Sequence, residues 1–255
     1  MSVVELRGVT KMFARGSTVA LQGIDLTIEA GEFVSLIGPS GCGKSTLLRT
    51  IGDLVQPTSG AIVVNGKSAE QARRDRDYGI VFQDPVLYDW RTVAKNIALP
   101  LEMLGWDRAR RTKRVEEMMH LVELTGFEGH HPWQLSGGMQ QRVSIARALS
   151  FSPALLLMDE PFGALDEMTR ERLNTELLRI WQETSSTIVF VTHSIAEAVF
   201  LSTRVVVMSA RPGRVAELID VDLKQPRTAE TREDPRYFEL VTAVREALAR
   251  GGADI

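Results

Sequence analysis

Residues 33–50 read FVSLIGPSGCGKSTLLRT, and this stretch decides the fold. Its first five residues, Phe33–Ile37, form a compact apolar run, which is typical of a strand covered on both faces in a parallel sheet. Residues 38–45, GPSGCGKS, match the pattern G-x-x-x-x-G-K-[ST], and residues 46–50 begin a helix. A buried strand, a glycine-rich loop and a helix in this order predict an α/β nucleotide-binding core.

The residue types of this phosphate loop (residues 38–46) suit phosphate binding. Glycines at 38, 41 and 43 allow the backbone to curl with its N–H groups pointing inward, and the helix N-terminus adds a partial positive charge. Lys44 can reach the β- and γ-phosphates, and the Ser45 hydroxyl can ligate Mg²⁺. A turn that binds nothing is the weaker alternative, and the loop alone does not distinguish kinases, GTPases and transport ATPases. The residues expected to contact the nucleotide are Gly38, Pro39, Ser40, Gly41, Cys42, Gly43, Lys44, Ser45 and Thr46.

Further apolar runs extend an alternation of strands and helices. Compact runs at 155–158, 188–191 and 205–208 are separated by helical stretches, which is the βαβ rhythm of an α/β protein. Near the N-terminus, Ile24, Leu26 and Ile28 alternate with polar residues at the period of a half-exposed strand. We expect a P-loop NTPase core with a mostly parallel sheet and an N-terminal antiparallel β subdomain.

The segment at 84–135 interrupts this rhythm. It has no strand-like run, and Val115, Met118, Met119 and Val122 recur at helical spacing within residues 112–125, so we expect an inserted α-helical subdomain. A terminal helix is expected with Phe238, Val241, Val244 and Leu248 on its apolar face. The predicted organisation is one domain: residues 2–30 and 59–80 form the antiparallel β part, 31–58 and 136–220 the nucleotide-binding core, 84–135 the helical insertion, and 221–255 a tail with a helix.

The composition is that of a globular protein with a mildly acidic balance. The chain has 255 residues, with 30 Lys+Arg against 33 Asp+Glu and a formal net charge of −3. A protein that coats nucleic acid needs a net positive field, so this class of function is disfavoured. The single cysteine, Cys42, cannot form an intramolecular disulfide, which fits a reducing cytosol. No secretory pattern is present and no apolar run approaches the ~20 residues of a membrane span, so we expect a chain outside the bilayer.

Charged side chains follow two of the apolar runs. Residues 155–160 read LLLMDE, and the carboxyl ends of parallel strands converge at one crevice. Asp159 is therefore a candidate Mg²⁺ ligand, and Glu160 a candidate to orient or deprotonate the attacking water. A solvated acidic pair is the alternative. His193 follows the run at 188–191, which makes it a candidate site residue as much as an ordinary polar histidine.

Residues 135–142 read LSGGMQQR, and we call them the signature segment. The chain contains, in this order, GPSGCGKST, Gln83, the signature segment, LLLMDEP, FGALD and His193. This ordered set closely resembles the ATP-binding cassette (ABC) family of transport ATPases. The resemblance covers nearly the whole chain, from residue 9 to residue 208. It implies an enzyme that hydrolyses ATP with Mg²⁺.

The resemblance also implies roles for individual residues. Phe13 resembles the aromatic residue that stacks on adenine, and Gln83 the glutamine that contacts Mg²⁺ and the attacking water and senses the membrane partner. His193 resembles the histidine that holds the γ-phosphate, and Asp166 the aspartate that links the two ATP sites. Ser136 and Gly138 resemble the signature residues that reach the γ-phosphate of an ATP held by the other subunit, and Gly137 between them is also expected to contact this nucleotide.

The position of the signature residues predicts a dimer. They precede a predicted helix, whose N-terminus favours an anion, although a plain serine N-cap is compatible with the same residues. Because the chain already has one complete phosphate loop, a second anion site on its surface requires an ATP held by another chain. We expect two copies to associate head to tail around two ATP molecules.

Transport would require further partners. Without a membrane span, the chain would lie peripherally on the cytoplasmic face of the inner (cell) membrane and need separate integral-membrane permease subunits, with a solute-binding protein as an indirect partner. We expect no nucleic acid partner. Candidate permease contacts, each with core packing as its alternative, are Val86, Leu87, Tyr88 and Trp90.

Two segments resemble one branch of importers. Residues 87–105, LYDWRTVAKNIALPLEMLG, and 208–223, MSARPGRVAELIDVDL, resemble ATPases of importers for nitrate, sulfonate, taurine, bicarbonate and similar small anions. Asp89 stands where members of this branch usually have proline. The alternatives are an ABC ATPase of another importer or exporter class, a soluble cassette protein that acts on nucleic acid or ribosomes, and a nucleotide-dependent regulator without turnover.

Cys42, inside the phosphate loop, has two interpretations. In the first, the anion cradle stabilises its thiolate, so ATP would protect it from alkylation. In the second, it is a small residue that fills a turn.

Overall fold

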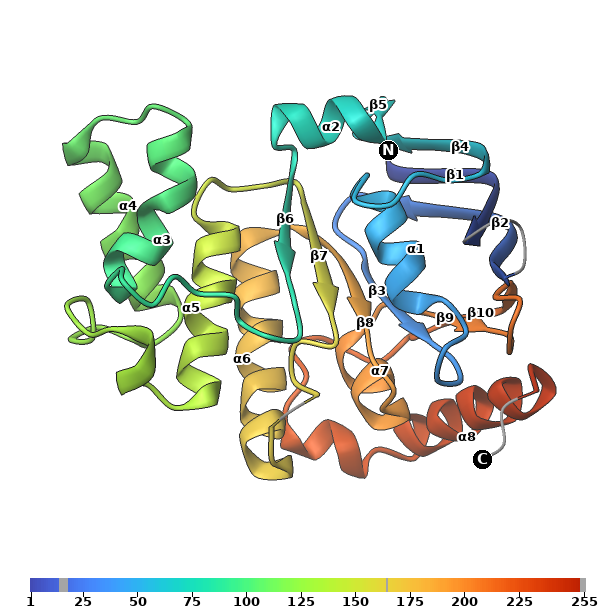
Figure 1. Cartoon of the computed structure of the whole chain (residues 1–255). Coiled ribbons are helices and arrows are strands. Elements are labelled where there is room, and N and C mark those ends of the chain that lie inside the picture. Colours follow the sequence, from blue (N-terminus) through green and yellow to red (C-terminus); the bar gives the residue numbers. More distant parts are fainter. Residues whose placement is uncertain (14–17, 164, 253–255) are drawn as a thin grey trace.

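The computed structural model describes residues 1–13, 18–163 and 165–252, in which a small antiparallel sheet, at the upper right of Figure 1, lies beside a larger mixed sheet that helices cover. The small sheet has the strand order β2-β1-β4-β5. Ile24, Leu26 and Ile28 on β2 are buried and alternate with exposed residues, as the sequence pattern predicts. The elements of this part are β1 (Ser2–Phe13), β2 (Thr18–Glu29), β4 (Ser59–Val64), β5 (Lys67–Ser68) and the helix α2 (Ala69–Asp75).

The larger sheet has the order β10-β9-β3-β8-β7-β6. Its members are β3 (Phe33–Ile37), β6 (Tyr78–Val81), β7 (Leu155–Asp159), β8 (Thr187–Val191), β9 (Arg204–Met208) and β10 (Val215–Asp220). Neighbouring strands from β9 to β6 pair in parallel, and β10 pairs antiparallel with β9 at one edge. Every residue of β3, β7 and β8 is buried, as expected for strands covered on both faces. The predicted α/β fold class is confirmed.

Strand β6 lies in a different sheet from the one expected. The sequence pattern assigned residues 59–80 to the antiparallel part, but β6 pairs in parallel with β7, with Tyr78 opposite Leu155. Local patterns do not reveal this pairing because it joins segments that are far apart in the chain. The pattern also gives no signal for β10, whose residues alternate only between half-buried and exposed positions.

Two apolar layers cover the large sheet, one on each face. On one face, Leu47 and Leu48 of α1 (Lys44–Ile51) pack with Leu36 of β3 and with the antiparallel sheet. On the other face, Phe33 of β3 packs with residues of α5 (Gly137–Leu149), α6 (Glu167–Thr184) and α7 (Ile195–Leu201). The centre of its ring lies 5.8 Å from that of Phe190. The sheet therefore holds the phosphate loop, which follows β3, on a rigid base.

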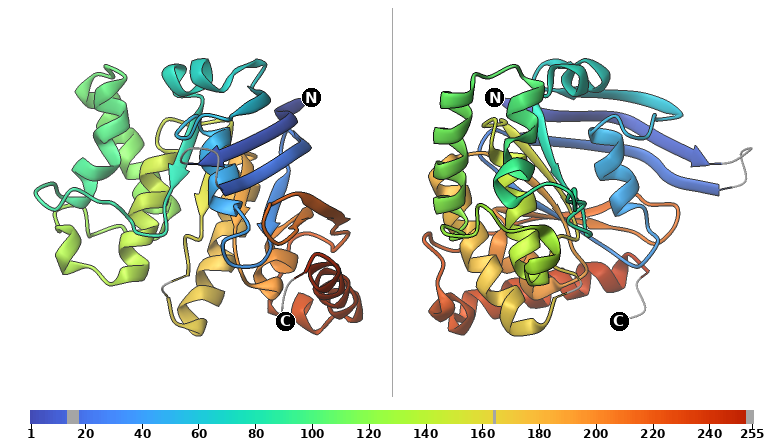
Figure 2. Two further views of the ribbon diagram at one scale, coloured as in Figure 1. Left: turned by 45° about the vertical axis from the view of Figure 1, so that its right-hand side comes forward. Right: turned by 60° about the vertical axis from the view of Figure 1, so that its left-hand side comes forward.

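The helical insertion forms a lobe at one side of the large sheet (Figure 2). It contains α3 (Val93–Met103), α4 (Arg108–Leu121) and the short η1 (Pro132–Gln134), and leads into α5 (Gly137–Leu149). Residues 84–135, all of which the structure describes, include no strand, as predicted. Val115, Met118 and Met119 are buried on one face of α4 in agreement with their spacing.

The tail ends in η2 (Ala229–Glu233) and α8 (Pro235–Arg250). Val244 and Leu248 are buried on α8 as expected, but Phe238 is 57% exposed, so its assignment to the buried face is wrong. Tyr237 takes the buried position instead and donates a hydrogen bond to the carbonyl oxygen of Ala196 at 3.1 Å. Within the described residues, no helix combines the length and apolar character that crossing a membrane requires.

Candidate active site

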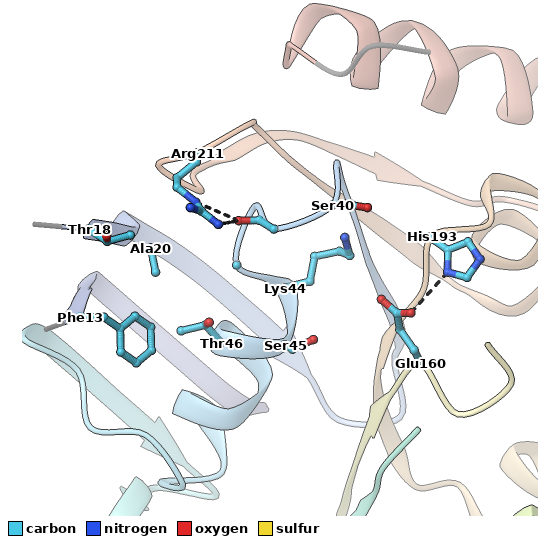
Figure 3. Close-up of a pocket in the computed structure, with 12 residues that line it drawn as sticks. Phe13, Thr18, Ala20, Ser40, Lys44, Ser45, Thr46, Glu160, His193 and Arg211 are labelled. Atoms are coloured by element: carbon cyan, nitrogen blue, oxygen red, sulfur yellow. Dashed lines mark hydrogen bonds and ion pairs between the residues drawn. The ribbon is translucent and has the colours of Figure 1, made fainter. Parts of the chain in front are cut away.

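A cavity of about 450 Å³ opens beside the phosphate loop, at the carboxyl end of β3 (Figure 3). Side chains that follow β3, β7 and β8 meet there because parallel strands end at one edge of the sheet. The residues that line it are Phe13, Thr18, Ala20, Ser40, Gly41, Gly43, Lys44, Ser45, Thr46, Glu160, His193 and Arg211.

The phosphate loop has the backbone conformation that its glycines allow. Gly41 and Gly43 have φ angles of 73° and 104°, which side chains with a Cβ rarely adopt. A Cβ on Gly43 would also lie 2.9 Å from a carbonyl oxygen of β2. The Lys44 ammonium donates to the carbonyl oxygens of Gly38 and Pro39 at 2.7 and 3.1 Å. Phosphate oxygens can replace these acceptors without moving the lysine far.

Two oxygen atoms suited to Mg²⁺ lie next to Lys44. Ser45 Oγ donates to Asp159 Oδ1 at 2.6 Å, which joins the loop to the end of β7. Arg49 Nη2 contacts the other oxygen of Asp159 at 3.1 Å. The described residues contain no group of three or more His, Cys, Asp or Glu side chains that could hold a metal ion. Because Mg²⁺ is commonly held by one or two protein ligands together with substrate phosphates, Ser45 and Asp159 fit this ion.

Glu160 and His193 face each other across the same cavity. His193 Nδ1 lies 3.4 Å from Glu160 Oε2. The N–H of Glu160 donates to the carbonyl oxygen of Val191 at 3.1 Å, and its φ of 46° places it in the left-handed region. Gln83 adjoins this pair, because a Cβ on Gly163 would lie 3.5 Å from Gln83 Nε2 and 3.6 Å from Glu160 Oε2. The Glu160 carboxylate thus lies beside both the imidazole of His193 and the side-chain amide of Gln83.

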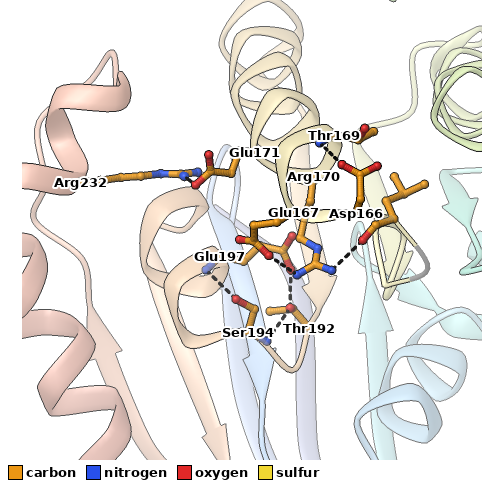
Figure 4. Close-up of polar contacts among 10 residues, drawn as sticks. Asp166, Glu167, Thr169, Arg170, Glu171, Thr192, Ser194, Glu197 and Arg232 are labelled. Carbon is orange, nitrogen blue, oxygen red and sulfur yellow. Dashed lines mark hydrogen bonds and ion pairs between the residues drawn. The ribbon is translucent and has the colours of Figure 1, made fainter.

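A buried polar cluster supports the backbone around His193 (Figure 4). The Thr192 hydroxyl donates to the carboxyl group of Glu197, and accepts a hydrogen bond from the N–H of Ser194 at 3.0 Å. Glu197 is only 7% exposed, and this burial raises the pKa of its carboxyl group. The residues before and after His193 are therefore both fixed.

Asp166 lies outside the cavity, at the start of α6. Its carboxylate accepts a hydrogen bond from the N–H of Thr169 at 3.0 Å, which caps the helix and lowers the pKa of Asp166. Arg170 Nη2 donates to the carbonyl oxygen of Leu165 at 2.8 Å. Thr169 packs closely on the signature segment: if Gly138 carried a Cβ atom, that atom would lie 3.1 Å from the Thr169 side chain. Because Asp166 caps the same turn of α6, it lies near the signature segment.

The signature residues also lie outside the cavity. Ser136 Oγ accepts a hydrogen bond from the N–H of Met139 at 3.3 Å and caps α5. Ser136 and Gly137 are exposed, whereas Gly138 is buried. One chain therefore does not bring these residues together with Lys44.

Phe13 lines the cavity at the end of β1. Its side chain is 39% exposed, and Lys11 Nζ lies 5.0 Å from the centre of its ring. The ring is thus accessible to a planar base, while residues 14–17, which follow it, are outside the described part of the chain.

Comparison with known proteins agrees with this arrangement. The family described as ABC transporter matches residues 21–163. The chain belongs to the ABC transporter family. It is 46% identical to the taurine import ATP-binding protein TauB of Rhizobium johnstonii, over 91% of this chain and 90% of that protein. It is 43% identical to the aliphatic sulfonates import ATP-binding protein SsuB of Bacillus cereus, over 98% of this chain and 97% of that protein.

A solved structure gives the same assignment for the fold. A dimeric ATP-binding cassette in a post-hydrolysis state, bound to ADP and Pi, superposes with a TM-score of 0.74 at 36% identity. The match covers 86% of this chain and 98% of that one. The chain is therefore an ABC ATPase with a P-loop NTPase fold, and it binds and hydrolyses ATP.

The ABC motifs do not include every residue that lines the cavity. Arg211, Thr18 and Ala20 also line it, and no pattern within the sequence marks them as site residues. Arg211 belongs to residues 208–223, the segment that resembles the importer branch. That resemblance assigns no chemical role to Arg211. Its place in the cavity depends on the pairing of β10 with β9, which the sequence does not predict.

Cys42 is buried within this ABC phosphate loop and does not line the cavity. Its side chain is 1% exposed, and burial raises the pKa of the thiol, an effect that Lys44 opposes only in part. A Cβ on Gly38 would lie 2.8 Å from Cys42 Sγ, so the thiol fills space below the loop. These contacts favour the interpretation of Cys42 as a small filling residue.

Proposed function

We propose that this chain is the ATP-hydrolysing subunit of an ABC importer for a small anion-like solute of the nitrate, sulfonate, taurine or bicarbonate type. The observation that carries the proposal is the cavity lined by Lys44, Ser45 and the Glu160–His193 pair. Asp159 lies directly behind Ser45 and accepts its hydrogen bond. A cation for phosphate, oxygen ligands for Mg²⁺ and a carboxylate for water are the parts that ATP hydrolysis needs.

The residues divide the chemistry among them. Lys44 and the N–H groups of the phosphate loop bind the phosphates, and Phe13 stacks on the adenine. Ser45, Asp159 and Gln83 would hold Mg²⁺, which neutralises charge on the β- and γ-phosphate oxygens. Glu160 accepts a proton from the attacking water, and His193 holds the γ-phosphate and orients that carboxylate.

The active unit in this proposal is a head-to-tail dimer. Ser136 and Gly137 are exposed at the N-terminus of a 13-residue helix and lie outside the cavity of their own chain. A second copy would place its signature segment against the γ-phosphate bound by the first, and Asp166, beside that segment, would link the two sites.

The helical insertion would contact the permease. Val86, Tyr88 and Trp90 are 60%, 41% and 74% exposed, which suits a contact surface, whereas Leu87 is partly buried against the core. Val86 stands three residues after Gln83, so in this proposal movement of the permease contact would reach the γ-phosphate side of the cavity. In this proposal the subunit lies on the cytoplasmic face of the cell membrane.

The solute assignment depends on the relatives. Their names give taurine and aliphatic sulfonates as the solutes that those proteins import. This ATPase would supply energy, and a permease with a solute-binding protein would choose the solute. An exporter subunit and a soluble cassette that acts on ribosomes are the alternatives.

Reconstitution tests the proposal. The chain is co-expressed with the permease encoded beside its gene, placed in nanodiscs, and assayed for phosphate release with the cognate binding protein. We expect binding protein loaded with taurine, an alkanesulfonate, nitrate or bicarbonate to stimulate hydrolysis. Recovery of the chain only with ribosomes or nucleic acid, or hydrolysis that no permease stimulates, would contradict the importer function.

A further inference from the structure

A cationic side chain outside the ABC motifs lines the nucleotide cavity. Arg211 lies in the hairpin between β9 and β10, far along the chain from the phosphate loop. Its Nε and Nη2 donate to the carbonyl oxygen of Gly41 at 3.2 and 3.1 Å. Figure 3 shows the guanidinium directed at the phosphate loop from the side on which Thr18 and Ala20 lie.

The hairpin that presents Arg211 is packed directly on the loop. The N–H of Gly213 donates to the carbonyl oxygen of Ala20 at 3.0 Å, and its own carbonyl accepts from the N–H of Gln22 at 2.9 Å. A Cβ on Gly213 would lie 2.0 Å from the carbonyl oxygen of Cys42, so only glycine fits there. Because β2 and the phosphate loop both hold the hairpin, Arg211 starts from a fixed position at the cavity.

The guanidinium of Arg211 retains donors for a ligand. Its hydrogen bonds within the described residues go to a neutral carbonyl oxygen, and none of the ion pairs in that part of the chain involves it. A guanidinium has five N–H donors, so some remain free after the bonds to Gly41. Arg214, three residues further, is also exposed, but it donates to Gln22 Oε1 at 2.7 Å and does not line the cavity.

We infer that Arg211 is a further nucleotide-binding residue, whose guanidinium binds the phosphate chain of ATP and ADP together with Lys44. The planar, permanently charged guanidinium offers paired donors that match phosphate oxygens. The inference rests on the proposed function in one respect, namely that this cavity holds the nucleotide. Its consequence is that the β9–β10 hairpin is part of the ATP site.

Nucleotide affinity tests the inference. The dissociation constant of a fluorescent ADP analogue is measured for the wild type and for Arg211→Ala, Arg211→Lys, Arg214→Ala and Lys44→Ala, with adenosine as a phosphate-free competitor. We expect Arg211→Ala to weaken ADP binding about ten-fold and Arg211→Lys to lie between it and the wild type. Arg214→Ala should bind as the wild type does, and adenosine should compete equally well in all arginine variants.

The outcomes separate the inference from the proposed function. If the wild type and Arg211→Ala bind ADP equally while Lys44→Ala loses affinity, the inference about Arg211 is wrong, but the cavity remains the proposed nucleotide site. If the wild type binds no adenine nucleotide, or Lys44→Ala binds it unchanged, the proposed site fails and the inference with it. Thermal unfolding and light scattering accompany each variant. Unchanged ADP affinity with weaker ATP-dependent association of two copies would assign Arg211 to the subunit interface and also overturn the inference.

Discussion

At the residue scale, Glu160 is the group whose removal should separate ATP binding from ATP hydrolysis. Glu160→Gln keeps the shape of the side chain and the contact with His193 but cannot accept a proton from water. We expect hydrolysis to fall by roughly 10²-fold or more, with ATP affinity retained and the ATP-bound dimer stabilised. Phosphate release and light scattering measure the two effects. Glu230→Gln, an exposed carboxylate on η2, is the control, and hydrolysis at the wild-type rate in Glu160→Gln would remove Glu160 from its role.

Cys42 provides a second test at the residue scale. Because its thiol is buried and its pKa is raised, little thiolate exists at neutral pH. We expect N-ethylmaleimide to react on the order of 10²-fold more slowly than with the urea-unfolded chain, equally with and without ATP. Since Cys42 is the only cysteine in the sequence, mass spectrometry reports this site alone. Rapid labelling that ATP blocks would restore the thiolate interpretation.

At the scale of elements, local hydrophobic patterns predicted which segments form buried strands, but not which strands pair with one another. The strands β3, β7 and β8 were predictable because both of their faces are covered, which requires compact apolar runs. The sheet to which β6 belongs was not predictable, because strand order depends on pairing between segments that are far apart in the chain. On α8, adjacent Tyr237 and Phe238 are both aromatic, but only Tyr237 has a hydroxyl that donates a hydrogen bond to the carbonyl oxygen of Ala196, and it is Tyr237 that is buried.

The contact between α5 and α6 makes a prediction about pH. Glu176 on α6 is 9% exposed, lies 3.7 Å from Arg142 of the signature segment, and faces Glu123, Arg172 and Arg179 as well. Burial raises its pKa from 4.5 to about 7, with Arg142 opposing the shift. The folded state therefore binds a proton that the unfolded state has lost, and the free energy of unfolding decreases as pH rises from 4.5 to about 7.

Glu176→Gln should remove this dependence because glutamine mimics the protonated acid. We expect the variant to match the wild type at pH 5 and to be more stable at pH 8 by on the order of 1–2 kcal/mol. Urea unfolding at both pH values measures the difference. The same stability difference at pH 5 and pH 8 would show that the carboxyl group of Glu176 does not titrate in this range.

At the scale of the whole molecule, the motifs were sufficient to propose a site but not to complete it. Lys44, Ser45, Glu160 and His193 were predictable because each follows a buried strand that ends at one edge. Arg211 was not predictable as a site residue, because it reaches the phosphate loop only through the folding of the β9–β10 hairpin. Ser136 and Gly137 of the signature segment are exposed and lie outside the cavity of their own chain, so a single chain does not bring them to Lys44.

The exposed aromatic pair on the helical insertion gives the last prediction. The rings of Tyr88 and Trp90 lie 4.7 Å apart, and the N–H of Tyr88 donates to Asn96 Oδ1 at 2.9 Å, which fixes this segment. A rigid, exposed aromatic group is the kind of residue that dominates binding energy at an interface. We expect Trp90→Ala to leave hydrolysis by the isolated chain unchanged and to reduce permease-stimulated hydrolysis about ten-fold. Phe238→Ala, at an exposed aromatic residue on α8, is the matched control, and equal stimulation in both variants would place the permease contact elsewhere.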